Sequence, residues 1–228
     1  MKIADTIKQR GHWRVRLFPT TYQSRIDNLL QLQKIVEGAQ VSLRGSHFPH
    51  IDHQNDSIQV RSDYVEHCVD WGQLKELWRL YRSMQFVLLR GLHEDWDEVS
   101  IWLGDRQPRL PGELLAITDV ITTLTEVFSF ASRLMARPEW EAGLTATVEL
   151  VGTKDRRLDA GPGRMPFMSA KVASEKSVLL EMGFADAGSL SQPRLAALGM
   201  AQLLFRLFKW DASLDSLQGV ADQLERGG

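Results

Sequence analysis

The sequence is poor in several features that would narrow its function. It contains one cysteine, Cys68, so it cannot form a disulfide within the chain, and such a chain suits a reducing compartment. No stretch approaches the roughly 18 consecutive apolar residues that a membrane-spanning helix needs. The first residues also lack the apolar segment of a secretory signal. We therefore expect a cytoplasmic protein that makes no contact with a membrane.

The chain also has little net charge. Its formal charge of −2 over 228 residues gives no general attraction to nucleic acid. The charge is unevenly distributed, however. Residues 1–50 hold eight Lys or Arg against three Asp or Glu, whereas residues 51–105 hold five against eleven. Surfaces of opposite sign can orient a protein partner during encounter, so this distribution favours a protein-binding role.

Short catalytic motifs are absent as well. The sequence contains no G-x-S-x-G, no phosphate-binding G-x-x-x-x-G-K-[ST], no G-x-G-x-x-G, no H-E-x-x-H and no C-x-x-C. These motifs carry the commonest nucleophilic, nucleotide and metal chemistry. We therefore predict no cofactor and assign no catalytic residue.

Hydrophobic patterning predicts a mixed α+β fold. Strand-like alternation or short apolar runs occur at 13–18, 41–45, 57–67, 85–91, 143–152 and 176–184. Helical spacing occurs at 24–38, where Ser24 and Asp27 fit a capping box, and at 70–84, 113–137, 192–210 and 214–224. Strands and helices are mixed along the chain, which is typical of an α+β domain. We predict one α+β domain over 1–228, with short strands, about five helices and packed halves 1–105 and 106–228.

The segment 113–137 has the strongest helical pattern. Its apolar residues step by three and four from Leu114 to Met135, which predicts a long, largely buried helix. One row of charged residues is expected to face water: Asp119, Glu126 and Arg133. A flank of small hydroxyl residues consists of Thr118, Thr122, Thr125, Ser129 and Ser132. Another backbone can approach this flank closely, either the helix at 192–210 or a second subunit at an interface.

Three of the six histidines lie in "SHFPHIDHQND" (46–56): His47, His50 and His53. Three imidazoles could hold a metal ion, and a metal-assisted hydrolase centred on them is one hypothesis. Positions three apart point to opposite faces of a strand, and Pro49 disfavours a helix. We therefore favour a loop in which Phe48 and Ile51 pack inward and the histidines are exposed or hydrogen-bonded.

Basic residues beside aromatic ones support a third hypothesis. "HWRVRLF", "SLRGSHF" and "KDRRL" could line a groove that binds phosphates and stacks bases. The arginines concerned are Arg14, Arg16, Arg44, Arg156 and Arg157. A nucleic-acid or nucleotide-binding module using an arginine-bearing strand face is therefore an alternative, although such domains usually show a clearer basic excess.

Three stretches, "VSLRGSHFPHID", "WRLYRSMQFVLLRGL" and "ELVGTKDRRL", are similar to pieces of bacterial proteins of comparable length for which no activity is known. The resemblance implies a bacterial origin and one continuous domain, and no functional residue can be carried over. With the missing catalytic motifs, it favours a non-enzymatic binding or accessory subunit of a bacterial multi-protein system. Defence against phage or foreign DNA is one setting for such subunits. The expected partners are other protein subunits, with a homo-oligomer and nucleic acid as open alternatives.

Overall fold

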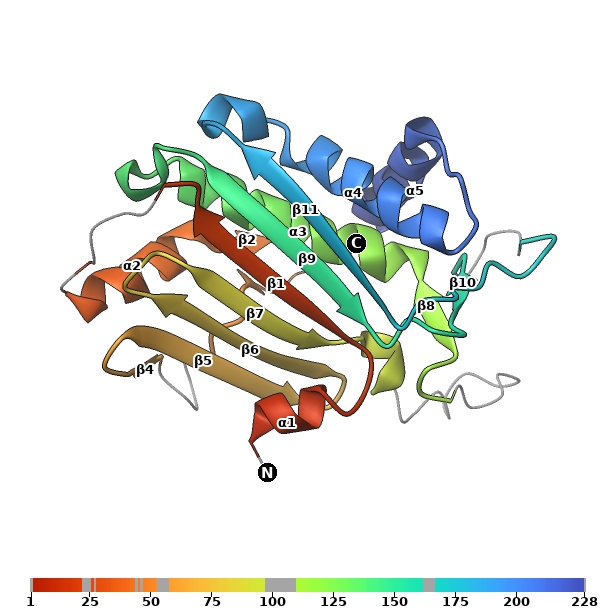
Figure 1. The fold of residues 1–228 in the computed structure, drawn as a ribbon, viewed down its shortest axis with the longest axis horizontal. Coiled ribbons are helices and arrows are strands. Elements are labelled where there is room, and N and C mark those ends of the chain that lie inside the picture. The colour runs from red at the N-terminus through yellow and green to blue at the C-terminus, as the bar shows by residue number, and fades with distance from the viewer. Residues whose placement is uncertain are drawn as a thin grey trace.

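The computed structural model describes residues 2–21, 26, 28–43, 45, 47–52, 58–96, 110–161 and 167–227. Its main feature is one antiparallel sheet of seven strands with four helices on one face (Figure 1). The strands lie side by side in the order β11 (Ser177–Phe184), β9 (Leu144–Val151), β1 (His12–Pro19), β7 (Phe86–Gly91), β6 (Leu74–Tyr81), β5 (Tyr64–Trp71) and β4 (Gln59–Val60). The structure therefore confirms the predicted α+β fold with five helices among the described residues.

The helices are α1 (Ile3–Ile7), α2 (Leu29–Ala39), α3 (Ile117–Met135), α4 (Pro193–Leu207) and α5 (Leu214–Gly227). Three short 3-10 helices are η1 (His93–Asp95), η2 (Pro138–Trp140) and η3 (Ala187–Leu190). Two small strand pairs complete the fold: β8 (Leu114–Ala116) runs parallel to β10 (Arg157–Asp159), and β2 (Val41–Ser42) runs antiparallel to β3 (His47–Phe48). No helix in the described part of the chain is long and apolar enough to cross a membrane.

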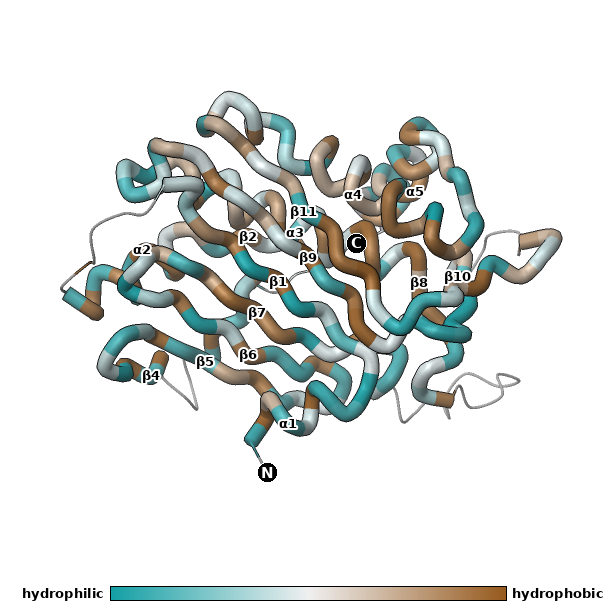
Figure 2. Tube along the Cα trace, in the orientation of Figure 1, coloured by the Kyte–Doolittle hydropathy of each residue, from teal (hydrophilic) through white to brown (hydrophobic). Residues whose placement is uncertain are grey.

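Strand β1 joins the two halves of the chain at the centre of the sheet. It pairs with β7 on one side and with β9 on the other. Alternate residues Trp13, Val15 and Leu17 are buried on the helix-covered face, as the sequence pattern predicts. Figure 2 shows the same alternation of hydrophilic and hydrophobic residues along the central strands. Strands from both sides of residue 105 thus share one hydrophobic core.

Helix α3 packs across the back of the sheet and organises the core. Its Phe130 lies 4.7 Å from Phe86 of β7, and its Phe128 lies 5.8 Å from Phe184 of β11, measured between ring centroids. Helices α2, α4 and α5 lie on the same side of the sheet (Figure 1). The predicted long buried helix at 113–137 is therefore present, although residues 114–116 form β8 before it begins.

The opposite face of the sheet is covered only in part. Helix α1 lies in front of it, where Ile7 packs against Leu77 of β6 and Leu89 of β7 (Figure 1). Elsewhere this face carries polar and charged side chains, including Arg14 and Arg16 of β1, which are half-exposed and exposed. We call this side the open face of the sheet.

The prediction of a helix at 70–84 is wrong. The segment forms the end of β5 and all of β6, joined by a tight turn in which Gly72 has a φ of +46°. Strand β6 has apolar residues on both faces, which gives a spacing like that of a helix. Trp78 faces the core, while Leu77 faces α1. Because α1 covers one end of the open face, β6 lacks the alternation of a half-buried strand.

Two details of the predicted helices also change. The capping box of Ser24 and Asp27 lies outside the described residues, and the side chain of Asn28 caps α2 by accepting a hydrogen bond from the Leu30 N–H. The charged row of α3 does not face water as a whole. Glu126 is buried and Asp119 is half-buried, whereas Arg133 is exposed.

Leu124 of α3 provides a test of the core. Replacing Leu124, which is fully buried, by Ala should lower the free energy of unfolding by about 2–5 kcal/mol, because it removes packed methyl groups and leaves a cavity. The matched control is Leu203→Ala on α4, where the leucine is exposed and a change of roughly 0.5 kcal/mol is expected. Urea unfolding measures both, and equal effects at the two positions would contradict this packing.

Candidate functional site

Seven buried ionisable side chains gather around one end of the sheet and the adjoining face of α3: His50, Glu76, Arg90, Glu94, Asp95, Glu126 and Arg156. Charged groups are costly to bury without partners. Their contacts therefore decide whether they stabilise the fold or serve a chemical function.

The first group joins β6, β7 and α3. Glu76 and Arg90 are opposite each other in the β6–β7 register, so both side chains project onto the helix-covered face. Arg90 Nη1 lies 2.7 Å from Glu126 Oε2 and 3.8 Å from Glu76 Oε2. Burial acts to lower the pKa of Arg90, but the two carboxylates raise it. The guanidinium therefore stays charged between Glu76 and Glu126.

His50 belongs to this group. Its backbone N–H donates to Glu76 Oε1 at 2.9 Å, and its Nδ1 lies 3.2 Å from Glu76 Oε2. Trp78 Nε1 donates to the His50 carbonyl at 2.8 Å. Burial acts to raise the pKa of Glu76, but His50 and Arg90 lower it. His50 therefore anchors its loop in the core.

The hypothesis of a histidine metal site gains nothing from this arrangement. His47 is exposed in β3, His50 is bonded to Glu76, and His53 lies outside the described residues. Within the described ranges, no group of three His, Cys, Asp or Glu side chains could hold a metal ion. His47 and His50 thus match the two alternatives of the predicted loop, since His47 is exposed and His50 is hydrogen-bonded to a buried carboxylate.

A second group ties four segments together through Asp95 and Arg156. Asp95 accepts hydrogen bonds from the backbone N–H groups of Gly11 and Gly112 at 2.8 and 2.9 Å, and from Arg156 through both carboxylate oxygens. Arg156 also donates to the Leu114 carbonyl at 2.7 Å. Both side chains are buried, so the loss of either partner would leave the other as an uncompensated buried charge.

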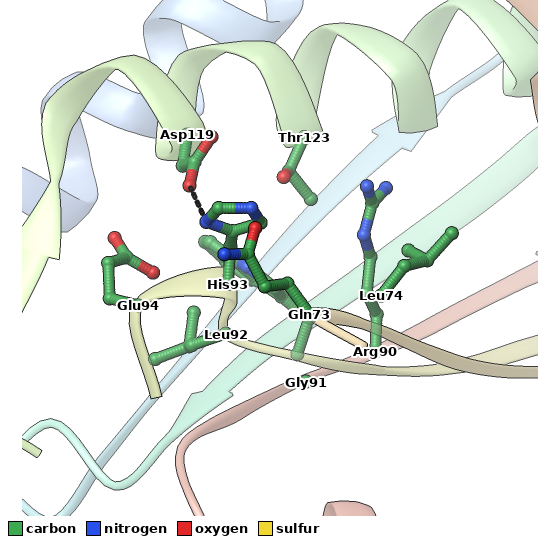
Figure 3. A pocket seen from close by; sticks show the side chains of 10 residues that line it. Gln73, Leu74, Arg90, Gly91, Leu92, His93, Glu94, Asp119 and Thr123 are labelled. Carbon is green, nitrogen blue, oxygen red and sulfur yellow. Dashed lines mark ion pairs between the residues drawn. The ribbon is translucent and has the colours of Figure 1, made fainter. Parts of the chain in front are cut away.

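A small pocket opens beside these groups, between the end of β7 and the first turns of α3 (Figure 3). It is lined by Trp13, Gln73, Leu74, Arg90, Gly91, Leu92, His93, Glu94, Asp119 and Thr123. His93 Nδ1 lies 4.0 Å from Asp119 Oδ2, the ion pair marked in Figure 3. The pocket has a volume of about 30 Å³, enough for about two water molecules and too small for an organic substrate.

Glu94 is the most perturbed acid of the pocket. Its Oε1 accepts a hydrogen bond from the Ala116 N–H just before α3, while no donor among the described residues reaches its buried Oε2. Burial, and then the nearby Asp119 carboxylate, raise the pKa of Glu94 to about 7. Groups with such a pKa can exchange protons at neutral pH, which makes this pocket the best candidate for chemistry in the described part of the chain.

The raised pKa of Glu94 predicts a stability change with pH. Between about pH 4.5 and 7 the folded chain keeps this proton while the unfolded chain loses it, so the free energy of unfolding falls as the pH rises. The shift corresponds to about 3 kcal/mol. Glu94→Gln mimics the protonated acid and should leave stability nearly unchanged at about pH 4 but raise it by about this amount at about pH 8. Urea unfolding at both pH values measures this, and a variant with the wild-type pH dependence would contradict it.

The sequence missed the residues that form this site. Glu76 lies in a segment that was predicted to be a helix. Glu126 was predicted to lie on the water-facing side of its helix. Arg90 carried a usable signal, because a charged residue at the end of the apolar run "FVLLRG" needs a buried partner. Nothing in the sequence placed Glu94 beside Asp119, since that contact depends on how β7 leads into η1 beside α3.

The five arginines of the nucleic-acid hypothesis do not form one surface. Arg14 and Arg16 share the open face, but Arg14 Nη1 is paired with Glu149 Oε2 at 2.7 Å. Arg156 is buried against Asp95, and Arg157 belongs to the separate β8–β10 pair. Arg44 lies outside the described residues.

The hydroxyl flank of α3 is half-buried along its length. Two of its hydroxyls bond back to their own helix, since Thr122 Oγ1 donates to the Thr118 carbonyl and Thr125 Oγ1 to the Ile121 carbonyl, at 2.8 and 2.7 Å. Ser129 and Ser132 continue the flank. An interface there stays a prediction.

No protein-family model, curated protein or solved structure matches the chain. Its function is therefore inferred from its own residues.

Proposed function

We propose that the chain is a non-enzymatic binding or accessory subunit that acts through protein–protein contacts. The buried ionisable groups support this role indirectly, because Glu76, Arg90 and Glu126 are engaged with one another inside the fold and the adjoining pocket admits only water. The side chains that are accessible to a protein partner lie on the outer surface instead.

The observation that carries the proposal is a row of exposed leucines on α4. Leu195, Leu203 and Leu207 are 51, 41 and 39% exposed. They are spaced by eight and four residues, so with Gly199 they form one row along the helix. Leu203 and Leu207 are direct neighbours on this row, and exposed apolar side chains grouped on one helix are typical of a surface that another protein covers.

The free edge of strand β11, which packs against α4, extends this surface. This strand forms the edge of the sheet, has eight residues and contains no proline and one charged side chain, Glu181. Its Leu179 is 61% exposed, but it is opposite Glu149 of β9 and therefore lies on the open face of the sheet, away from α4. Edge strands are usually shortened, charged or covered to prevent pairing with other chains, and β11 lacks most of these protections. We define the partner surface as α4 and β11 together.

Co-purification from cells that carry the gene tests this function. The tagged chain should retain a partner in fixed ratio, and the double variant Leu195→Gln/Leu203→Gln should lose it while remaining folded. The matched control is Leu110→Gln/Met168→Gln, which changes two other highly exposed apolar residues. The proposal fails if the partner is retained equally by both variants, or if the wild-type chain has no partner.

A further inference from the structure

The open face of the sheet carries a groove between α1 and the strands β5 and β6, with a volume of about 410 Å³. Sites for small organic ligands usually enclose about 300–1,000 Å³. Figure 1 shows α1 in front of the sheet, and its Ile3 and Ala4 line the groove. The groove lies near the β4 edge of the sheet, whereas β11 forms the opposite edge, so the groove can be considered separately from the partner surface.

The groove has a fixed positive end. Arg61, just after β4, and Arg79 of β6 each place Nε 2.9 Å from a different oxygen of the Glu66 carboxylate. Burial acts to raise the pKa of Glu66, but the hydrogen bonds from both arginines lower it, so Glu66 is ionised and orients both guanidinium groups. Lys2 also lines the groove, which gives three cations against one carboxylate. Arg61 also donates from Nη2 to Gln59 Oε1, and Arg79 is hydrogen-bonded to Tyr81. A guanidinium has five N–H donors, so each arginine keeps further donors beyond these contacts.

Apart from Gln59 and His67, the rest of the groove is apolar or aromatic. Leu77 of β6 lies in it, and Ala4 contributes from α1. Tyr64 of β5 is held by Arg79, whose Cζ lies 4.8 Å from the centroid of the Tyr64 ring. Apolar surface beside paired, oriented guanidinium groups suits a molecule with one anionic end and one apolar end.

We propose that this groove binds a small amphipathic organic anion, with its anionic group at Arg61 and Arg79 and its apolar body along Leu77 and α1. Both a carboxylate and a phosphate monoester satisfy this chemistry. The proposal uses no contact of α4 or β11, so it is independent of the proposed function.

Calorimetric titration with three probes of equal chain length tests the site: decanoate, decyl phosphate and the neutral decanamide. At least one anion should bind with a stoichiometry of one, and the stronger of the two identifies the head group. Decanamide should bind at least tenfold more weakly, because it lacks the charge that the arginines recognise. If neither anion binds, or if decanamide binds as tightly as the anions, the proposal is wrong.

Variants locate the binding on the protein. Arg61→Gln and Arg79→Gln should each lower the affinity for the anion roughly tenfold. Arg16→Gln, on β1 of the same face, is the matched control and should leave the affinity unchanged. Ala4→Phe fills the groove without altering its charge and should also abolish binding, which guards against loss of fold in an arginine variant. An affinity that none of the three groove variants changes would place the ligand elsewhere and overturn the proposal.

Discussion

Replacing Asp95 by Ala should lower the free energy of unfolding by about 4 kcal/mol, among the largest effects of a single substitution in this protein. The substitution leaves the Arg156 guanidinium buried without its carboxylate. It also removes the acceptor for the N–H groups of Gly11 and Gly112. The segments around Gly11, Gly112 and Arg156 then no longer share a hydrogen-bond acceptor. Chemical denaturation should show the lower free energy of unfolding in one cooperative transition.

The exposed ion pair of Arg206 and Asp211 is the matched control. Its atoms lie 2.9 Å apart, as in many close ion pairs, but the two side chains are 52 and 80% exposed. Asp211→Ala should therefore change stability by no more than about 0.5 kcal/mol. If Asp95→Ala is as mild as Asp211→Ala, the buried pair does not hold the fold as described.

Replacing Arg90 by Met should have an effect of similar size, about 3–5 kcal/mol. Methionine fills comparable space, so the loss comes mainly from charge. Glu76 and Glu126 would remain buried without the cation between them. Adding Glu126→Gln should recover part of the loss, because one of the two uncompensated carboxylates disappears.

The double variant gives this prediction its control. Glu126→Gln alone should destabilise the protein, yet in the Arg90→Met background it should stabilise it. Urea unfolding of the four chains in this cycle measures the coupling between the two sites. Strictly additive effects would contradict the direct pairing of Arg90 with Glu126.

Local pattern predicted most of the fold. Strand β1, with its alternation of Trp13, Val15 and Leu17, and helix α3 were predicted because each buries one regular set of side chains. Strand β6 was mistaken for a helix because its two faces bury apolar residues against different elements, the core and α1. A short sequence window cannot reveal that second covering element.

The candidate site was less predictable because it depends on contacts far apart in the chain. His50 meets Glu76 across 26 residues, and Arg156 meets Asp95 across 61. Residue type alone suggested metal binding for the histidine and phosphate binding for the arginine. The same polar side chains serve instead as partners for buried carboxylates, which is how folded proteins commonly satisfy internal charge.

The protein–protein role is tested most directly by a photo-crosslinking residue placed at Leu203 on α4, in cells that carry the gene. A crosslink at Leu203 to one discrete protein, absent when the same residue replaces the highly exposed Met168, is the result we predict. Equal crosslinking from both positions, or none from Leu203, would contradict the assignment of α4 and β11 as the partner surface.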